Sequence, residues 1–132
     1  MPMTIRVDQE RNELSVTAKG PISLGDIKAH LLEEEEGLGL GYRELIDASG
    51  AYPTLSPADI RTVVEILRDL GRKGALGPTA IVVPDDVTYG MCRMLEMLVD
   101  DVCDIRPFRI SERAEAEQWL ATAAIRGPSG PS

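Results

Sequence analysis

The chain is poor in the residue types on which many binding and catalytic sites depend. Its 132 residues include one histidine, two cysteines and one tryptophan, and 14 basic residues stand against 22 acidic ones. The resulting formal net charge of −8 repels phosphate backbones and anionic lipid headgroups. We therefore expect no nucleic-acid partner and no membrane-surface role.

Long apolar runs are also missing. No stretch approaches the roughly 20 apolar residues that cross a bilayer, and Met1-Pro2-Met3-Thr4 runs directly into a strand-like pattern, without a signal-peptide pattern. Cys92 and Cys103 lie among apolar neighbours, which favours buried, reduced thiols over a redox pair. These features predict a cytoplasmic protein.

The composition indicates one globular domain. Apolar residues make up 43% of the chain and charged residues 27%, and a chain of this length can fold without disulfides or metal. We expect residues 1–125 to form a single domain. Residues 126–132 contain only Arg, Gly, Pro and Ser and are expected to be a disordered tail.

The chain alternates between strand and helix patterns. Residues 4–8 and 13–18 alternate apolar and polar positions around a polar turn at 9–12, which predicts an antiparallel hairpin. The later predicted elements are a helix at 23–36, a short strand at 45–46, a helix from 56, a strand at 80–83, a helix from 85 to about 98, a strand at 105–108 and a helix from Ser111 whose inward residues are Ala116, Trp119, Leu120 and Ala123. Strand–helix–strand units require right-handed crossovers and a mostly parallel sheet, with the first strand antiparallel at one edge. Pro107 removes a hydrogen-bond donor and argues for a sheet edge. The prediction is a layered α/β domain with a mixed, mostly parallel five-stranded sheet and about four helices.

This element order, with a capped helix after the central strand, resembles the STAS domain of sulfate transporters and bacterial anti-sigma-factor antagonists. The likeness covers residues 4 to about 122, and residues 85–96 (DDVTYGMCRMLE) resemble a segment of uncharacterised bacterial STAS-like proteins. In the antagonists, a serine at the start of the second helix is phosphorylated. Ser56 in Thr54-Leu55-Ser56-Pro57-Ala58-Asp59 stands at that position, although the usual Asp-Ser-Ser-Gly run is absent. The resemblance implies a non-catalytic module that binds a protein partner or a second copy of itself, gated by phosphorylation at Ser56.

Ser56 also has a purely structural interpretation. In Ser56-Pro57-Ala58-Asp59 the serine caps a helix, the proline presets the first turn and the aspartate faces the positive end of the helix dipole. Capping needs no function, whereas a phosphate here would be stabilised by the dipole or would repel an acidic partner. Both interpretations remain open.

Catalytic chemistry has no recognisable signature. His30 lies on the side of the first predicted helix away from the apolar stripe of Leu24, Ile27 and Leu31, which predicts an exposed side chain. Without a base beside a nucleophile, nucleophilic catalysis is not supported, and no nucleotide-binding glycine motif follows a strand. We expect no enzyme, no catalytic residue and no cofactor.

Two groups of acidic residues are candidate metal sites. The residues of the run 33–36 fan around a helix axis, so they cannot converge on one ion, and the run is interpreted as a solvated helix end. Asp47, Asp85 and Asp86 follow predicted strands, at the edge where α/β sheets bind ligands. They lack the companion residues of response-regulator magnesium sites, so a helix cap and a turn are the preferred interpretations and no metal is expected.

The third predicted helix has more apolar surface than one sheet contact needs. Its expected core stripe is Val87, Met91, Met94, Leu95 and Leu98. The surface expected to contact a protein partner or a second copy consists of Tyr89, Arg93, Glu96 and Met97. Tyrosine, arginine and methionine are enriched at protein interfaces. Two alternatives are a buried core helix with a polar ridge and one wall of a groove that carries a small apolar ligand. An apolar pocket beside this helix would favour the carrier, and a flat surface over a closed core would favour the protein partner.

Overall fold

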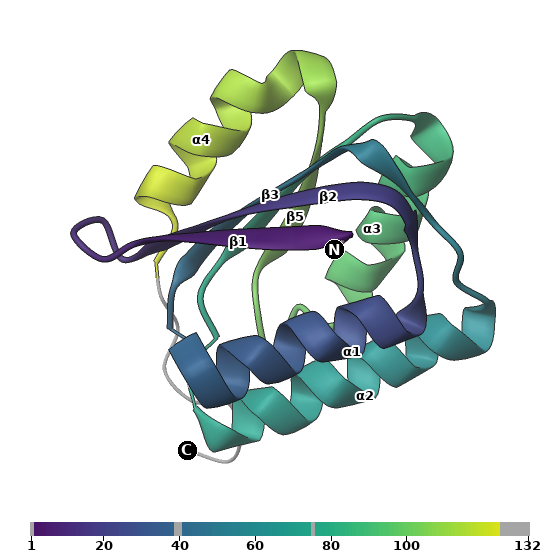
Figure 1. Ribbon diagram of the computed structural model, residues 1–132, viewed down its shortest axis with the longest axis horizontal. Helices are drawn as coiled ribbons and strands as arrows, with labels where there is room; N and C mark the ends of the chain where they lie inside the picture. Colours follow the sequence, from purple (N-terminus) through teal and green to yellow (C-terminus); the bar gives the residue numbers. More distant parts are fainter. Residues whose placement is uncertain (1, 39–40, 75, 125–132) are drawn as a thin grey trace.

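The computed structural model describes residues 2–38, 41–74 and 76–124 and has an α/β fold (Figure 1). The strands are β1 (Met3–Asp8), β2 (Glu13–Ile22), β3 (Arg43–Pro53), β4 (Thr79–Val83) and β5 (Ile105–Arg109). The helices are α1 (Leu24–Glu33), α2 (Pro57–Lys73), α3 (Asp86–Leu98) and α4 (Arg113–Thr122), with a π-helical turn at Glu34–Leu38 and a 3-10 turn at Ile110–Glu112. The expected tail at 126–132 lies outside the described residues.

The sheet has the order β1-β2-β3-β4-β5. β1 pairs antiparallel with β2, and the other neighbouring strands pair in parallel. The predicted antiparallel edge strand is therefore confirmed. Pro107 lies in β5, the opposite edge, where its missing N–H costs no second ladder of hydrogen bonds.

The two longest strands exceed their predicted lengths. β2 continues through Gly20-Pro21 to Ile22, beyond the predicted end at residue 18, and β3 spans eleven residues instead of a short segment at 45–46. The β2–β3 register shifts between Thr17 and Lys19, and Gly20 has a φ of 71°, which glycine adopts without strain. The extra residue of this shift lies in β3, between Asp47 and Gly50, while glycine and proline, which are rare in strands, occupy β2 at positions 20 and 21. Both features make the strands look shorter in the sequence than they are.

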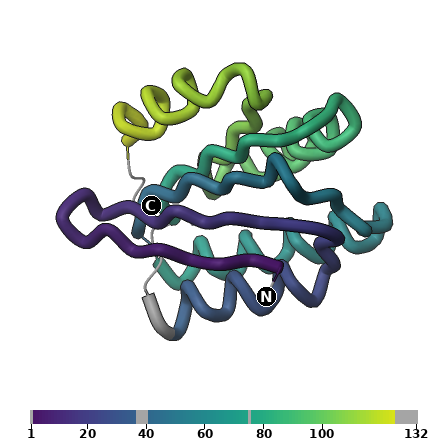
Figure 2. Tube along the Cα trace, turned by 45° about the horizontal axis from the view of Figure 1, so that its top comes forward, coloured from purple at the N-terminus to yellow at the C-terminus, as the bar shows by residue number. Residues whose placement is uncertain are grey.

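Helices cover both faces of the sheet. α1 and α2 lie side by side on one face and α4 lies on the other, an arrangement visible in two views (Figures 1 and 2). α3 shares the face of α1 and α2, because Leu95 packs against the same core cluster as Val63 and Leu67 of α2. On the opposite face, Ala116 and Leu120 of α4 are buried and Trp119 is half-buried, as predicted.

Side-chain caps begin three of the four helices. Ser23 with Asp26, and Ser56 with Asp59, form capping boxes, and the Asp85 carboxylate accepts a hydrogen bond from the Thr88 N–H. The predicted cap at Ser111 is wrong. The Glu112 carboxylate accepts the Arg109 N–H at 2.8 Å, which stabilises a 3-10 turn over residues 110–112, and α4 begins after it.

Candidate functional site

The buried face of α3 differs from the predicted one. Val87 is 76% exposed, and Met94 and Leu98 are each 43% exposed, so three members of the expected core stripe face outward. The inward residues are Thr88, Met91, Cys92, Leu95 and, just after the helix, Val99. The two stripes share Met91 and Leu95, and their mean directions differ by about 70° around the helix axis. Because apolar residues occupy much of both stripes, periodicity alone could not choose between them.

The predicted partner surface on α3 is only partly free. Arg93 forms an ion pair with Glu96 at 2.8 Å, and the Arg109 guanidinium lies 4.1 Å from the centre of the Tyr89 ring. Met97 is 63% exposed. Tyr89 therefore contacts Arg109 at the end of β5, while Met97 lies beside the exposed apolar residues of α3.

An apolar cavity of about 190 Å³ lies between the sheet and helices α1, α2 and α3. Side chains from all three helices and from the sheet line it, among them Ile27, Val63, Leu95, Ile46 and Ile81. The polar side chains of its lining are His30, Glu44, Thr79 and Thr88. The cavity therefore offers an apolar chamber with a polar group at the amino ends of β3 and β4, where Glu44 and Thr79 lie.

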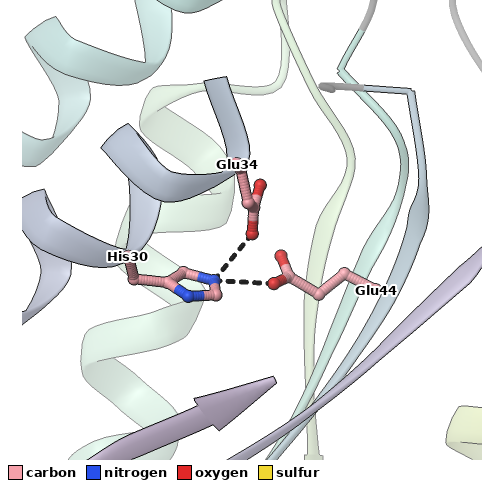
Figure 3. A group of neighbouring side chains, drawn as sticks. All are labelled: His30, Glu34 and Glu44. Atoms are coloured by element: carbon pink, nitrogen blue, oxygen red, sulfur yellow. Dashed lines mark hydrogen bonds and ion pairs between the residues drawn. The ribbon is translucent and has the colours of Figure 1, made fainter. Parts of the chain in front are cut away.

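Three ionisable side chains meet beside this cavity (Figure 3). Nε2 of His30 lies 2.7 Å from Oε2 of Glu44 and 2.6 Å from Oε1 of Glu34. All three residues are buried, with exposures of 6% for His30 and Glu44 and 8% for Glu34. The prediction of an exposed His30 is wrong. Ala29 and Leu32, on the side of α1 away from the apolar stripe, are exposed, whereas His30 lies on the flank of the stripe, where Glu44 supplies a polar partner.

The pKa values of these groups follow from burial and from one another. Burial alone lowers the pKa of His30, but its interactions with Glu34 and Glu44 outweigh burial and raise that pKa to about 10. Burial raises the pKa of Glu44 to about 8. Burial also opposes ionisation of Glu34, yet the contact with His30 lowers its pKa. Near neutral pH the cluster therefore contains an imidazolium, one ionised carboxylate and one neutral carboxyl group, with no net charge.

The acidic run at 33–36 is only partly the solvated helix end that was predicted. Glu33 and Glu36 are exposed, and Glu35 forms an ion pair with Lys73 at 2.7 Å. Glu34 turns inward and joins His30. The sequence signal for this pair was the i,i+4 spacing of His30 and Glu34, which places both on one side of a helix.

The three aspartates at the other end of the strands have separate partners. Asp47 accepts hydrogen bonds from Ser49 and pairs with Arg113 at 2.9 Å. Asp85 caps α3, as one interpretation predicted, and Asp86 pairs with Arg109 at 2.9 Å. Within the described residues, the group whose ligand atoms lie close enough to share a metal ion is His30, Glu34 and Glu44.

Ser56 is exposed at the start of α2, and its capping role is confirmed. Its Oγ accepts the Asp59 N–H at 3.1 Å, while the Asp59 carboxylate accepts the Ser56 N–H at 2.9 Å. Phosphorylation of this hydroxyl stays a prediction.

Comparison with known proteins identifies the fold. No protein-family model and no curated protein matches the sequence. A solved structure of an uncharacterized protein of the DUF3478 family from Shewanella loihica PV-4, described as having a SpoIIAA-like fold, aligns with 89% of this chain and 91% of that chain at a TM-score of 0.58. The chain has a SpoIIAA-like fold. The sequence identity is 19%, so the comparison extends to the fold alone.

The SpoIIAA-like fold confirms the STAS-like architecture that the element order predicted. Within this fold, the cavity and the His30–Glu34–Glu44 cluster share the layer between the sheet and helices α1 to α3. Among the described helices, none is long and apolar enough to cross a membrane.

Proposed function

We propose that the chain binds and carries a small apolar ligand in the cavity between the sheet and helices α1, α2 and α3. The observation that supports this proposal is the almost wholly apolar lining around about 190 Å³ of space. An apolar cavity of about 150 Å³ inside a protein stays dry and accepts benzene or xenon. The ligand class is therefore a single hydrocarbon ring or a short branched chain.

The energetic cost of an empty cavity also supports a role in binding. Protein interiors are packed as densely as organic crystals. Apolar side chains that line an empty space lack part of the contacts that a densely packed core provides. A ligand of matching shape recovers the dispersion contacts that the lining lacks. Binding would therefore stabilise the folded chain.

Thermal melts with benzene, toluene and cyclohexane as probes test this proposal. At saturating probe, the melting temperature is expected to rise by a few degrees, because the ligand binds the folded state alone. Ala51→Leu fills part of the cavity from β3 and is expected to abolish the rise, whereas Ala58→Leu, at an exposed position of α2, keeps it. Equal responses of wild type and Ala51→Leu, or no response of wild type to any probe, would contradict the proposal.

Protein binding through α3 is the second candidate function. Its support is the exposed apolar surface formed by Val87, Met94, Met97 and Leu98, which are 76%, 43%, 63% and 43% exposed. Contiguous apolar surface of this kind marks interaction sites. The occupant is a protein partner or a second copy of the chain, with the predicted contacts of Tyr89, Arg93 and Glu96 at its border.

Regulation by phosphorylation at Ser56 belongs to this second candidate. The exposed hydroxyl at a helix start supports it, since a phosphate there would be stabilised by the helix dipole. Ser56→Asp is expected to keep the cap and change partner affinity. Unchanged affinity for every recovered partner would contradict the regulatory part. A cytoplasmic location completes the proposal. Cys92 and Cys103 form no disulfide in the described part of the chain, which is consistent with that location.

A further inference from the structure

Three metal-ligating atoms converge on one point in the buried cluster. Nε2 of His30, from α1, faces Oε1 of Glu34, at the start of the π-helical turn, and Oε2 of Glu44, from β3 (Figure 3). The ligand atoms of the three residues all lie within 4.8 Å of one another. Three elements, α1, the π-helical turn and β3, therefore present one imidazole nitrogen and two carboxylates to the same small volume.

Hydrogen bonding within the cluster leaves one of these atoms unsatisfied. A single Nε2–H can point at one acceptor, and Glu44 takes that position at 2.7 Å. Oε1 of Glu34 is equally near, at 2.6 Å, yet it is a buried acceptor without a hydrogen-bond partner, as is Nδ1 of His30. Leaving a buried carboxylate oxygen unsatisfied is costly, whereas a cation between the three atoms would accept a lone pair from each.

The charges of the donors match a divalent ion. A neutral imidazole with two carboxylates carries a charge of −2, and a divalent cation makes the buried site neutral. Neither Glu34 nor Glu44 forms an ion pair with a lysine or arginine of the described residues. Their cationic partner is His30, whose Nε2 proton a bound ion would displace. Thr79 is positioned to hold the second oxygen of Glu44, with Oγ1 to Oε1 at 3.5 Å.

The donor types select the class of metal. One imidazole nitrogen and two carboxylate oxygens suit Zn²⁺ and neighbouring first-row ions, whereas Ca²⁺ takes about six to eight oxygen ligands. Ligands about 2.0–2.2 Å from a tetrahedral zinc ion lie roughly 3.3 Å apart. Each carboxylate would therefore withdraw from Nε2 by only about 0.6 Å, a shift within the reach of glutamate rotamers. We propose that His30, Glu34 and Glu44 bind a divalent first-row metal ion.

This metal site does not depend on the apolar-ligand proposal. His30 and Glu44 also line the cavity, so three protein ligands leave the ion a further position for water or for a polar group of a molecule held there. Occupation by benzene or toluene tests the cavity alone, and zinc binding tests the cluster alone.

Calorimetric titration of the chelator-stripped chain with zinc chloride tests the site. One ion is expected to bind per chain, with a Kd in the micromolar range or below. Glu44→Gln and Glu34→Gln are each expected to weaken zinc binding by more than about a hundredfold. Losing a residue that only hydrogen-bonds to a metal ligand weakens binding by about 10- to 100-fold. Glu33→Gln is the matched control, since Glu33 is exposed on the same helix, and it keeps wild-type affinity. Far-ultraviolet circular dichroism verifies that each variant folds.

X-ray absorption of the zinc-loaded chain supplies a second readout that does not require variants. The expected neighbours of zinc are nitrogen and oxygen atoms. Sulfur neighbours would assign the metal to Cys92 or Cys103, and equal zinc affinities of wild type, Glu34→Gln and Glu44→Gln would assign it to the acidic surface. Either result, or no saturable binding by wild type, would overturn the proposal.

Discussion

Nε2 of His30 lies 2.7 Å from Oε2 of Glu44, and this contact joins the last turn of α1 to the start of the central strand β3. Both side chains are almost fully buried. Glu34 approaches the same nitrogen from the other side, so the contact is part of a cluster and not an isolated ion pair. His30 and Glu44 line one end of the apolar cavity, so the polar groups of the cavity lie mainly at that end.

Removing the imidazole is expected to destabilise the metal-free chain more than neutralising Glu44. His30→Leu leaves an ionised Glu34 beside Glu44 without the cation that compensates it, a change expected to cost about 3–5 kcal/mol. Glu44→Gln retains a neutral group of the same shape, because Glu44 has a raised pKa of about 8 and is mostly protonated at pH 7; a cost of about 1 kcal/mol or less is expected. Urea unfolding in the presence of chelator measures both. A larger cost for Glu44→Gln than for His30→Leu would contradict this assignment of charges.

The helix cap at Ser56 gives a prediction with a matched control. Ser56→Ala is expected to lower the free energy of unfolding by about 1 kcal/mol, since the Asp59 N–H loses its acceptor. Ser111, a cap in the sequence prediction, is exposed and makes no cap hydrogen bond in the structure. Ser111→Ala is therefore expected to change stability by less than about 0.5 kcal/mol. Equal losses for the two variants in urea titrations would contradict the assigned start of α4.

The thiol of Cys92 reports on the cavity. Burial raises the pKa of Cys92 to about 11, so the reactive thiolate is scarce at neutral pH. Alkylation by iodoacetamide is expected to accelerate about tenfold for each pH unit between about pH 7 and 10, because the thiolate fraction rises in that proportion below the pKa. In denaturant the thiol regains its ordinary pKa of 9.0, and the increase levels off earlier.

Peptide mapping by mass spectrometry separates Cys92 from Cys103. Since Cys92 lines the cavity, toluene is expected to slow its alkylation in the folded chain and to leave the denatured chain unaffected. If labelling of Cys92 levels off at the same pH in the folded chain as in denaturant, the thiol is not buried as described.

The two sides of α3 are expected to respond differently to substitution. Leu95→Ala removes apolar contacts beside the cavity and is expected to cost about 2–5 kcal/mol. Met97→Glu, at a 63% exposed position, is expected to change stability by less than about 0.5 kcal/mol while weakening self-association or partner binding. Thermal melts and sedimentation measure the two effects. If Met97→Glu unfolds the chain as severely as Leu95→Ala, α3 has no free apolar surface.

The sequence predicted the elements well because their patterns are local. The hairpin, the capped start at Ser56 and the apolar strand at 80–83 depend on neighbouring residues, and the parallel sheet follows from their order. The register shift between Thr17 and Lys19 and the length of β3 depend on pairing between distant strands. No periodicity within one segment contains that information.

The polar cluster was missed for a different reason. Glutamate is rarely buried unless it has a partner, and the partners here lie fourteen residues apart on a helix and a strand. His30 and Glu34 share one side of a helix, a visible signal, but the sequence does not show that Glu44 faces them. The buried side of α3 could not be predicted from the sequence either, since apolar side chains lie on two sides of this helix.

Diffraction from crystals pressurised with xenon tests the central proposal, an apolar binding cavity, most directly. Xenon is small, apolar and electron-dense, and it enters cavities of this size without chemical bonding. The predicted result is a xenon atom between the sheet and α3, in contact with Ile46, Ile81 and Leu95, in wild type and not in Ala51→Leu. A closed core containing neither xenon nor a co-purified ligand would contradict the account.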